Sequence, residues 1–285
     1  LSFLIFFPIS MAFVLAISPL GAKGVRNGAF VVGTIIFLVS FYMSTQFESI
    51  GSMQFVEIYP WITNYGIDFS VGIDGFSLTI LMLIATLMPS AYLLLWKDRT
   101  KGYWVSMLLI QGGILGSLFS QDLILFYIFW EAMLLPVFMI IGMYGSGDKI
   151  YSTLKMTIYT IIGSLFMFVA ILYLGVSFYY EFGYWSFALE ELKNLTILSE
   201  SERIWVFLAF FIAFAIKIPL FPFHTWLPKA YSNSPTGGVF LLSSIMAKLG
   251  VYGIVRFIFP LFPDLVLSWS SWIMWLGIFG LFYFG

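Results

Sequence analysis

Long apolar runs divide the chain, and each is about as long as a helix that crosses a membrane. An α-helix needs about 20 mostly apolar residues to cross the hydrocarbon core. Since lipid offers no hydrogen-bond partners, such runs must pair their backbone groups internally. The sequence therefore predicts an all-α polytopic membrane protein with about nine transmembrane helices. The nine runs are residues 1–20, 28–45, 76–96, 103–120, 122–144, 153–178, 204–227, 236–259 and 266–285.

Composition narrows the class of protein further. Hydrophobic residues make up 61% of the 285 residues and charged residues 9%, a balance unlike that of soluble globular domains. The chain has no cysteine and one histidine, which excludes disulfides, thiolate-bound iron–sulfur clusters and bis-histidine haem for this stretch. A net charge of −1 gives no indication of a nucleic-acid partner. We expect no bound cofactor and no bound metal.

The connecting loops alternate in charge along the chain. Odd-numbered loops hold eight Lys and Arg residues, Lys97 and Arg99 among them, and even-numbered loops hold three. The positive-inside rule places the odd loops in the cytoplasm and the N-terminus in the periplasm. The chain begins and ends within apolar runs, which predicts a fragment of a longer protein. The aromatic loop 46–75 predicts an interfacial segment, and its Asp74-Gly75 pair is typical of a hairpin turn.

Three ionisable residues lie near the middle of predicted spans: Glu131, Lys217 and Lys248. A charge at that depth costs roughly 2.5–3.5 kcal/mol on insertion scales, so it indicates either a function or a partner. A glutamate–lysine pair can simply hold helices together, but a second lysine leaves an excess of positive charge. Burial disfavours the charged form of each group and an ion pair favours it. Such a row of charges is typical of a proton relay.

Prolines interrupt two of the spans that carry these charges. Pro136, five residues after Glu131, predicts a helix kink with or without a functional role. His224 lies seven residues after Lys217, and it either relays protons or hydrogen-bonds the freed backbone. Around it, a discontinuous helix is predicted by Pro219, Pro222 and Pro228. Candidates for holding water, or for hydrogen bonds between helices, are Thr157, Thr160, Ser243 and Ser244.

Four stretches resemble a known family. Residues 126–145 (FYIFWEAMLLPVFMIIGMYG), 213–238 (AFAIKIPLFPFHTWLPKAYSNSPTGG), 246–257 (MAKLGVYGIVRF) and 71–89 (VGIDGFSLTILMLIATLMP) are similar to the antiporter-like membrane subunits of respiratory complex I. The pattern is most like the chain M branch, called chain 4 in mitochondria. Essentially the whole chain takes part in the resemblance. One departure is Leu227-Pro228-Lys229-Ala230-Tyr231, where relatives often have LPDAH.

The resemblance implies an antiporter-like bundle with a discontinuous seventh helix. Residues 1–102 would form three N-terminal helices with a long periplasmic loop. Residues 103–260 would form the first five-helix repeat, helices 4–8, and residues 261–285 the truncated start of a second, inverted repeat. The implied partners are other membrane subunits of complex I and the lipid bilayer. The implied location is the bacterial inner membrane, or alternatively the mitochondrial inner membrane.

The resemblance also implies a mechanism. Glu131 would pair with Lys217, and Lys248 would continue a hydrated central axis, so that quinone reduction in distant subunits drives proton transfer. The chain itself would carry no redox chemistry. Two alternatives stay open: a subunit of a sodium/proton antiporter or membrane-bound hydrogenase of the same fold, and a scaffold whose charges serve only helix packing.

Overall fold

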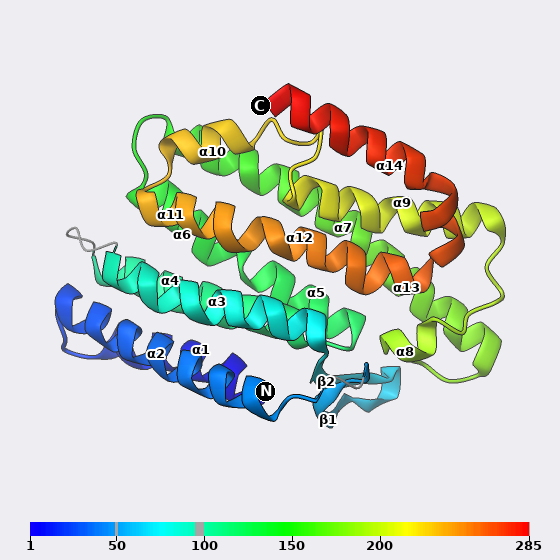
Figure 1. Ribbon diagram of the computed structural model, residues 1–285, viewed down its shortest axis with the longest axis horizontal. Helices are drawn as coiled ribbons and strands as arrows, with labels where there is room; N and C mark the ends of the chain where they lie inside the picture. Colours follow the sequence, from blue (N-terminus) through cyan, green and yellow to red (C-terminus); the bar gives the residue numbers. More distant parts are fainter. Residues whose placement is uncertain (49–50, 95–99, 285) are drawn as a thin grey trace.

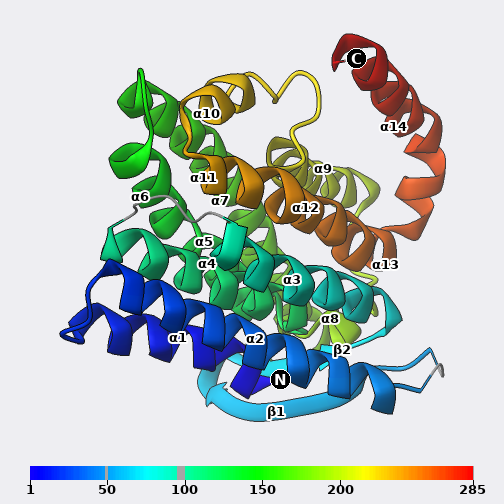
Figure 2. The ribbon, with the colours of Figure 1, turned by 60° about the vertical axis from the view of Figure 1, so that its left-hand side comes forward.

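A computed structural model describes residues 1–48, 51–94 and 100–284. The helices lie side by side in layers (Figures 1 and 2), with α1 packed on α4 and α2 on α3 at one side, and α7 packed on α9 towards the other. The long helices are α1 (Ser2–Ile17), α2 (Ala22–Gln46), α3 (Gly75–Leu94), α4 (Lys101–Phe119), α7 (Lys149–Phe182), α9 (Glu200–Lys217) and α14 (Pro263–Phe284). The shorter helices are α5 (Leu123–Ala132), α6 (Leu134–Tyr144), α8 (Leu189–Leu192), α10 (Leu227–Asn233), α11 (Thr236–Leu241), α12 (Ala247–Gly253) and α13 (Phe259–Leu261).

The helical class predicted from the apolar runs is confirmed. Within the described ranges, seven helical segments are long and apolar enough to cross a membrane. The 16-residue α1 is shorter, and α9 ends early, at Lys217. Together with α1 and α9, the seven segments account for the nine predicted runs. Helix α4 lies at the centre of the packing, and nearly all of its side chains are buried.

The loop between α2 and α3 forms a β-hairpin. Strand β1 (Gln54–Ile62) pairs antiparallel with β2 (Ile67–Ile73). Its turn is the 3₁₀ segment η1 (Thr63–Tyr65) followed by Gly66, whose φ of 59° favours glycine. The prediction of a hairpin turn at Asp74-Gly75 is wrong, because Asp74 instead caps α3 by accepting a 2.8 Å hydrogen bond from the Ser77 N–H.

Even-numbered loops meet at one end of the bundle, and odd-numbered loops meet at the other end. At one end the Gln121 N–H donates to the Ser70 carbonyl (2.9 Å) and the Leu123 N–H donates to the Phe187 carbonyl (3.0 Å), which joins the second, fourth and sixth loops. At the other end the Ser146 N–H donates to the Asn233 carbonyl (2.8 Å), which joins the fifth and seventh loops. Two of the counted basic residues, Lys97 and Arg99, lie outside the described residues.

The helix predicted over 236–259 is continuous but irregular. Two π-helical segments interrupt its α-helical geometry: η2 (Leu242–Met246) precedes α12 and η3 (Ile254–Ile258) follows it. A π segment absorbs an extra residue, so it changes the direction in which the following side chains point. No periodicity in the apolar pattern signalled these segments.

Candidate functional site

Helix α9 ends at Lys217, where the predicted discontinuity falls. Pro219 lacks the N–H that would bond the Ala215 carbonyl, and the Leu220 N–H takes that carbonyl instead at 2.7 Å. This shift frees the carbonyl of Ile216, which accepts a 3.0 Å hydrogen bond from the buried Trp226 indole. Local hydrogen bonds thus satisfy both carbonyls at the break, as a low-dielectric environment requires.

The Lys217 side chain is buried at the end of α9, with 6% of its surface exposed. Its Nζ lies 4.9 Å from the centre of the Trp130 ring, a cation–π contact. The carboxylate of Glu131, the next residue on α5, lies within electrostatic range of the ammonium group. Within the described part of the chain, no ion pair of 4.0 Å or shorter joins Glu131 and Lys217. The structure therefore brings these two predicted residues near each other without direct contact.

Glu131 lies one residue before the end of α5. Pro136 removes the N–H that would bond the Ala132 carbonyl, and the helix is interrupted at Met133 before it resumes as α6. The predicted kink is therefore present, next to the half-buried Glu131.

Lys248 occupies a different position from the other two charges. Its side chain is exposed on α12, and Nζ donates a 2.6 Å hydrogen bond to the Ser243 carbonyl of the preceding π segment. The hydroxyls of Ser243 and Ser244 donate to the Phe240 carbonyl of their own helix. The prediction that these serines bond between helices is therefore wrong. Among the described residues, no hydrogen bond links the Lys248 side chain with Lys217 or Glu131.

His224 lies in the non-helical stretch between α9 and α10. Its buried ring stacks on Phe221 at 5.7 Å between ring centres and meets the edge of Tyr283 of α14 at 5.2 Å. The neighbouring Thr225 shares a 2.7 Å hydrogen bond with the Tyr159 hydroxyl of α7. The break is thereby anchored to two helices, and the relay role of His224 remains a prediction.

A small cavity adjoins Lys217. Its volume is about 10 Å³, and it lies among α6, α7, α10, the α9 break and the π segment η2. Its polar lining includes Thr160 and Tyr231, and its apolar lining includes Met246 and Ala247. The Thr160 hydroxyl donates to the Met156 carbonyl (2.9 Å) within its own helix, so its predicted use in an interhelical bond is wrong.

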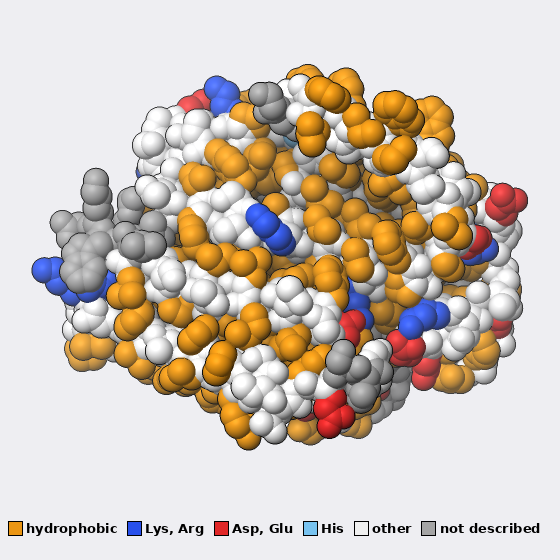
Figure 3. Space-filling view, in the orientation of Figure 1, with side chains coloured by type: hydrophobic (Ala, Val, Ile, Leu, Met, Phe, Trp, Pro, Cys, Tyr) orange, Lys and Arg blue, Asp and Glu red, His pale blue; other side chains and the backbone are white. Residues whose placement is uncertain are grey.

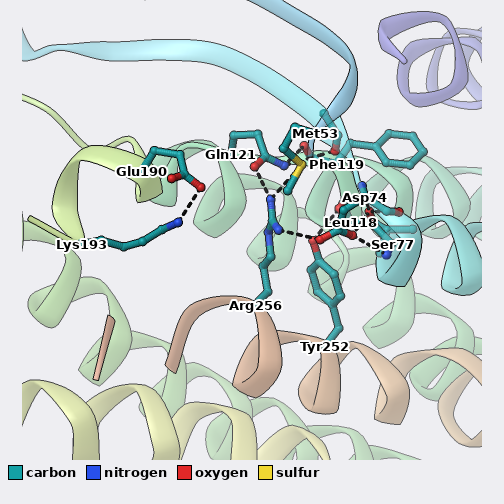
Figure 4. A network of polar contacts seen from close by, with 11 residues as sticks. Met53, Asp74, Ser77, Leu118, Phe119, Gln121, Glu190, Lys193, Tyr252 and Arg256 are labelled. Carbon is teal, nitrogen blue, oxygen red and sulfur yellow. Dashed lines mark hydrogen bonds and ion pairs between the residues drawn. The ribbon is translucent and has the colours of Figure 1, made fainter. Parts of the chain in front are cut away.

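Sequence reasoning missed a polar network at the end of the bundle where the hairpin lies (Figure 4). Arg256 Nη1 donates to the Asp74 carboxylate at 3.0 Å and Nη2 donates to the Gln121 side chain. The Tyr252 hydroxyl donates to the Leu118 carbonyl at 2.8 Å. Burial acts to raise the pKa of Asp74, but hydrogen bonds from Ser77 and the charge of Arg256 outweigh it and hold that pKa below its usual value. The only sequence signal was an arginine at the end of an apolar run.

The outer face over α3 and α12 is mostly apolar (Figure 3), and most of its charged side chains gather towards the ends of the bundle. Among the described residues, no group of three or more His, Cys, Asp or Glu side chains is placed to hold a metal ion. The functional groups at the site are a buried amine, a nearby carboxylate and hydroxyls, which are groups that can exchange protons.

The fold is that of antiporter-like membrane subunits. It is similar to a chain of "Respiratory complex I from Thermus thermophilus with bound NADH", with a TM-score of 0.83 and 28% sequence identity, covering 96% of this chain and 56% of that chain. Residues 120–285 match the family described as NADH:quinone oxidoreductase/Mrp antiporter, TM (transmembrane). This match covers more than half of the chain, and the chain belongs to that family.

Curated relatives agree with this assignment. The chain is 34% identical over 293 residues to NADH-quinone oxidoreductase subunit M of Rickettsia prowazekii, covering 99% of this chain and 58% of that protein. It is 38% identical over 256 residues to the subunit M of Escherichia coli K12, covering 87% of this chain and 50% of that protein. The chain therefore spans about half the length of the curated relatives it matches.

Proposed function

We propose that this chain is part of a proton-translocating membrane subunit of an NADH:quinone oxidoreductase, and that it carries no redox chemistry itself. The observation that supports this most is the lysine buried at a helix break with a carboxylate in electrostatic range. A buried amine that can lose and regain its charge suits proton transfer. The naming of the relatives as subunit M supports the choice of complex.

In this proposal Glu131 modulates the charge of Lys217, and Lys248 passes the proton onward. Residues 1–102 are the N-terminal helices, 103–260 the first five-helix repeat and 261–285 the start of the second. The partners are neighbouring membrane subunits of the complex. The subunit lies in a bacterial inner membrane, with the N-terminus and the even loops on the periplasmic side.

The test is Lys217→Ala in the assembled complex. Removing a proton-transfer group typically costs about a hundredfold in the step it serves, so we expect NADH-driven proton pumping in inverted vesicles to fall by roughly tenfold or more. Lys229→Ala, at an exposed lysine of α10, is the matched control. Wild-type pumping by a fully assembled Lys217→Ala complex would overturn the proposal.

A sodium/proton antiporter subunit is the second candidate, because the family description includes the Mrp antiporter. Sodium-dependent proton movement in vesicles without NADH oxidation would select it. Full pumping by a Glu131→Gln, Lys217→Met double variant would instead support a purely structural role for both charges.

A further inference from the structure

Trp130 of α5 presents its ring to the charged end of Lys217. The Lys217 Nζ atom lies 4.9 Å from the centre of the ring, inside the range of about 6 Å over which an aromatic face attracts a cation. Tryptophan gives the strongest attraction of this kind among the aromatic residues. Both side chains are buried, Trp130 with 3% and Lys217 with 6% of its surface exposed. Water therefore weakens the contact little.

The ring acts on one charge state of the lysine. A protonated amine is attracted by the negative face of the ring, and a neutral amine loses that attraction with its charge. Glu131 lies in electrostatic range of the ammonium group, and among the described residues the two form no ion pair. The ring thus stabilises the protonated lysine without binding it to a carboxylate.

Helix α5 offers the lysine two different partners in succession. Trp130 and Glu131 are adjacent in sequence, and adjacent side chains on an α-helix point about 100° apart. The flexible four-carbon stem of a lysine can direct its ammonium group to either of two such partners. In the structure the ammonium group lies against the ring, so the arrangement described is the one in which the lysine and the carboxylate are apart.

Aromatic packing fixes the orientation of the Trp130 ring. It meets the edge of Phe214 of α9 with ring centres 5.6 Å apart, and it packs on Phe126 of its own helix at 5.3 Å. Both of these rings contact Phe257 of the π segment η3, at 6.4 Å and 4.4 Å. Phe214 also lies three residues before Lys217, on the same side of α9. Turning the ring away from the lysine would therefore disturb contacts with two other helical segments.

We infer that Trp130 is a positioning residue for Lys217: its ring holds the protonated amine away from Glu131 and loses its hold when the amine becomes neutral. This inference rests on the proposed function. No covalent bond changes at the ring, because the proton that Lys217 gains or loses never passes through it. A desolvated contact of this kind favours the charged form over the neutral one by about thirtyfold.

The test weakens the face of the ring without changing its shape. Trp130 is replaced by tryptophans that carry one to four fluorine atoms, through nonsense suppression, in assembled complex in inverted vesicles. Fluorine withdraws electron density from the ring face, which weakens its attraction for a cation. We expect NADH-driven proton pumping, per NADH oxidised, to fall stepwise with each fluorine and at least threefold over the series. The same series at Trp104, buried on α4 against Tyr92 and Tyr103, should pump as wild type.

Two ordinary substitutions separate the aromatic face from side-chain volume. Trp130→Phe keeps a weaker aromatic face and should retain more pumping than Trp130→Leu, which has none. The inference is overturned if pumping stays level or rises across the Trp130 series while Lys217→Ala lowers it. Equal falls in the Trp130 and Trp104 series, or equal pumping by Trp130→Phe and Trp130→Leu, would assign the ring to packing and overturn it too. Wild-type pumping by fully assembled Lys217→Ala would instead overturn the proposed function itself.

Discussion

Lys217 and Lys248 both lie beside irregular helical segments, yet the Lys217 side chain is buried and the Lys248 side chain is exposed. Lys217 ends a broken helix, is buried, and faces an aromatic ring, a carboxylate in electrostatic range and a small cavity. Lys248 follows a π segment, is exposed, and bonds a carbonyl of its own helix. An apolar sequence with a central lysine thus produces two different environments.

The difference follows from how each helix loses its regular hydrogen bonds. At the α9 break, prolines remove donors, and the freed carbonyls draw in the Leu220 N–H and the Trp226 indole. These groups enclose the end of the helix and bury the lysine. On α12 no donor is lost, because a π segment only re-spaces the bonds. The chain continues past Lys248 without closing around it.

The two regions meet where α12 packs on the end of α9, and disrupting that contact should have the largest effect on stability. A Cβ atom at Gly250 would lie 2.6 Å from Ile218 Cγ1 and 3.1 Å from the Phe214 carbonyl. We expect Gly250→Leu to lower the free energy of unfolding by about 3 kcal/mol, as overpacking of a close contact does. Thermal or denaturant unfolding in detergent measures it.

Gly277→Leu is the control for this change, since a Cβ atom at Gly277 on α14 would meet no atom within 4 Å. Equal stability of the Gly250→Leu and Gly277→Leu proteins would show that the contact between the two regions is loose.

A smaller loss of stability is expected when only a hydrogen bond at the α9 break is removed. Trp226→Phe keeps an aromatic ring but leaves the Ile216 carbonyl buried without its indole donor. An unsatisfied buried acceptor costs about 1–3 kcal/mol, so we expect a loss near 2 kcal/mol, together with weaker pumping. Trp272→Phe, at a tryptophan 73% exposed on α14, should change neither quantity. A Trp226→Phe protein as stable as wild type would mean that the freed carbonyl finds another partner.

The smallest effect on stability is expected at Lys248. Its exposed side chain contributes one hydrogen bond to the Ser243 carbonyl, and surface substitutions away from special features change stability by about 0.5 kcal/mol or less. We expect Lys248→Met to unfold as wild type does while NADH-driven pumping falls. If Lys248→Met lowers stability as much as Trp226→Phe, the two lysine environments are more alike than their exposure indicates.

Much of this site could be predicted from residue types alone. A proline two residues after Lys217 cannot supply the donor a helix needs, which favours a break there, although Pro8 and Pro89 lie inside the continuous helices α1 and α3. Pro136 favours an interruption near Glu131 for the same reason. The hairpin turn was placed wrongly, because Asp-Gly is also a helix start when the aspartate can cap the next turn. The Arg256 network was missed because its members lie on separate elements far apart in sequence.

The sequence by itself determined the membrane-spanning helical class, the alternation of loop charge and the position of the α9 break, since these follow from apolar length, charge count and proline chemistry. Only the tertiary structure decided which lysine is buried, which carbonyls the break exposes and which hydroxyls share a cavity with Lys217. Those features depend on how helices distant in sequence pack. The two π segments beside Lys248 also belong to this second group, because an extra residue in a helix leaves no mark on its composition.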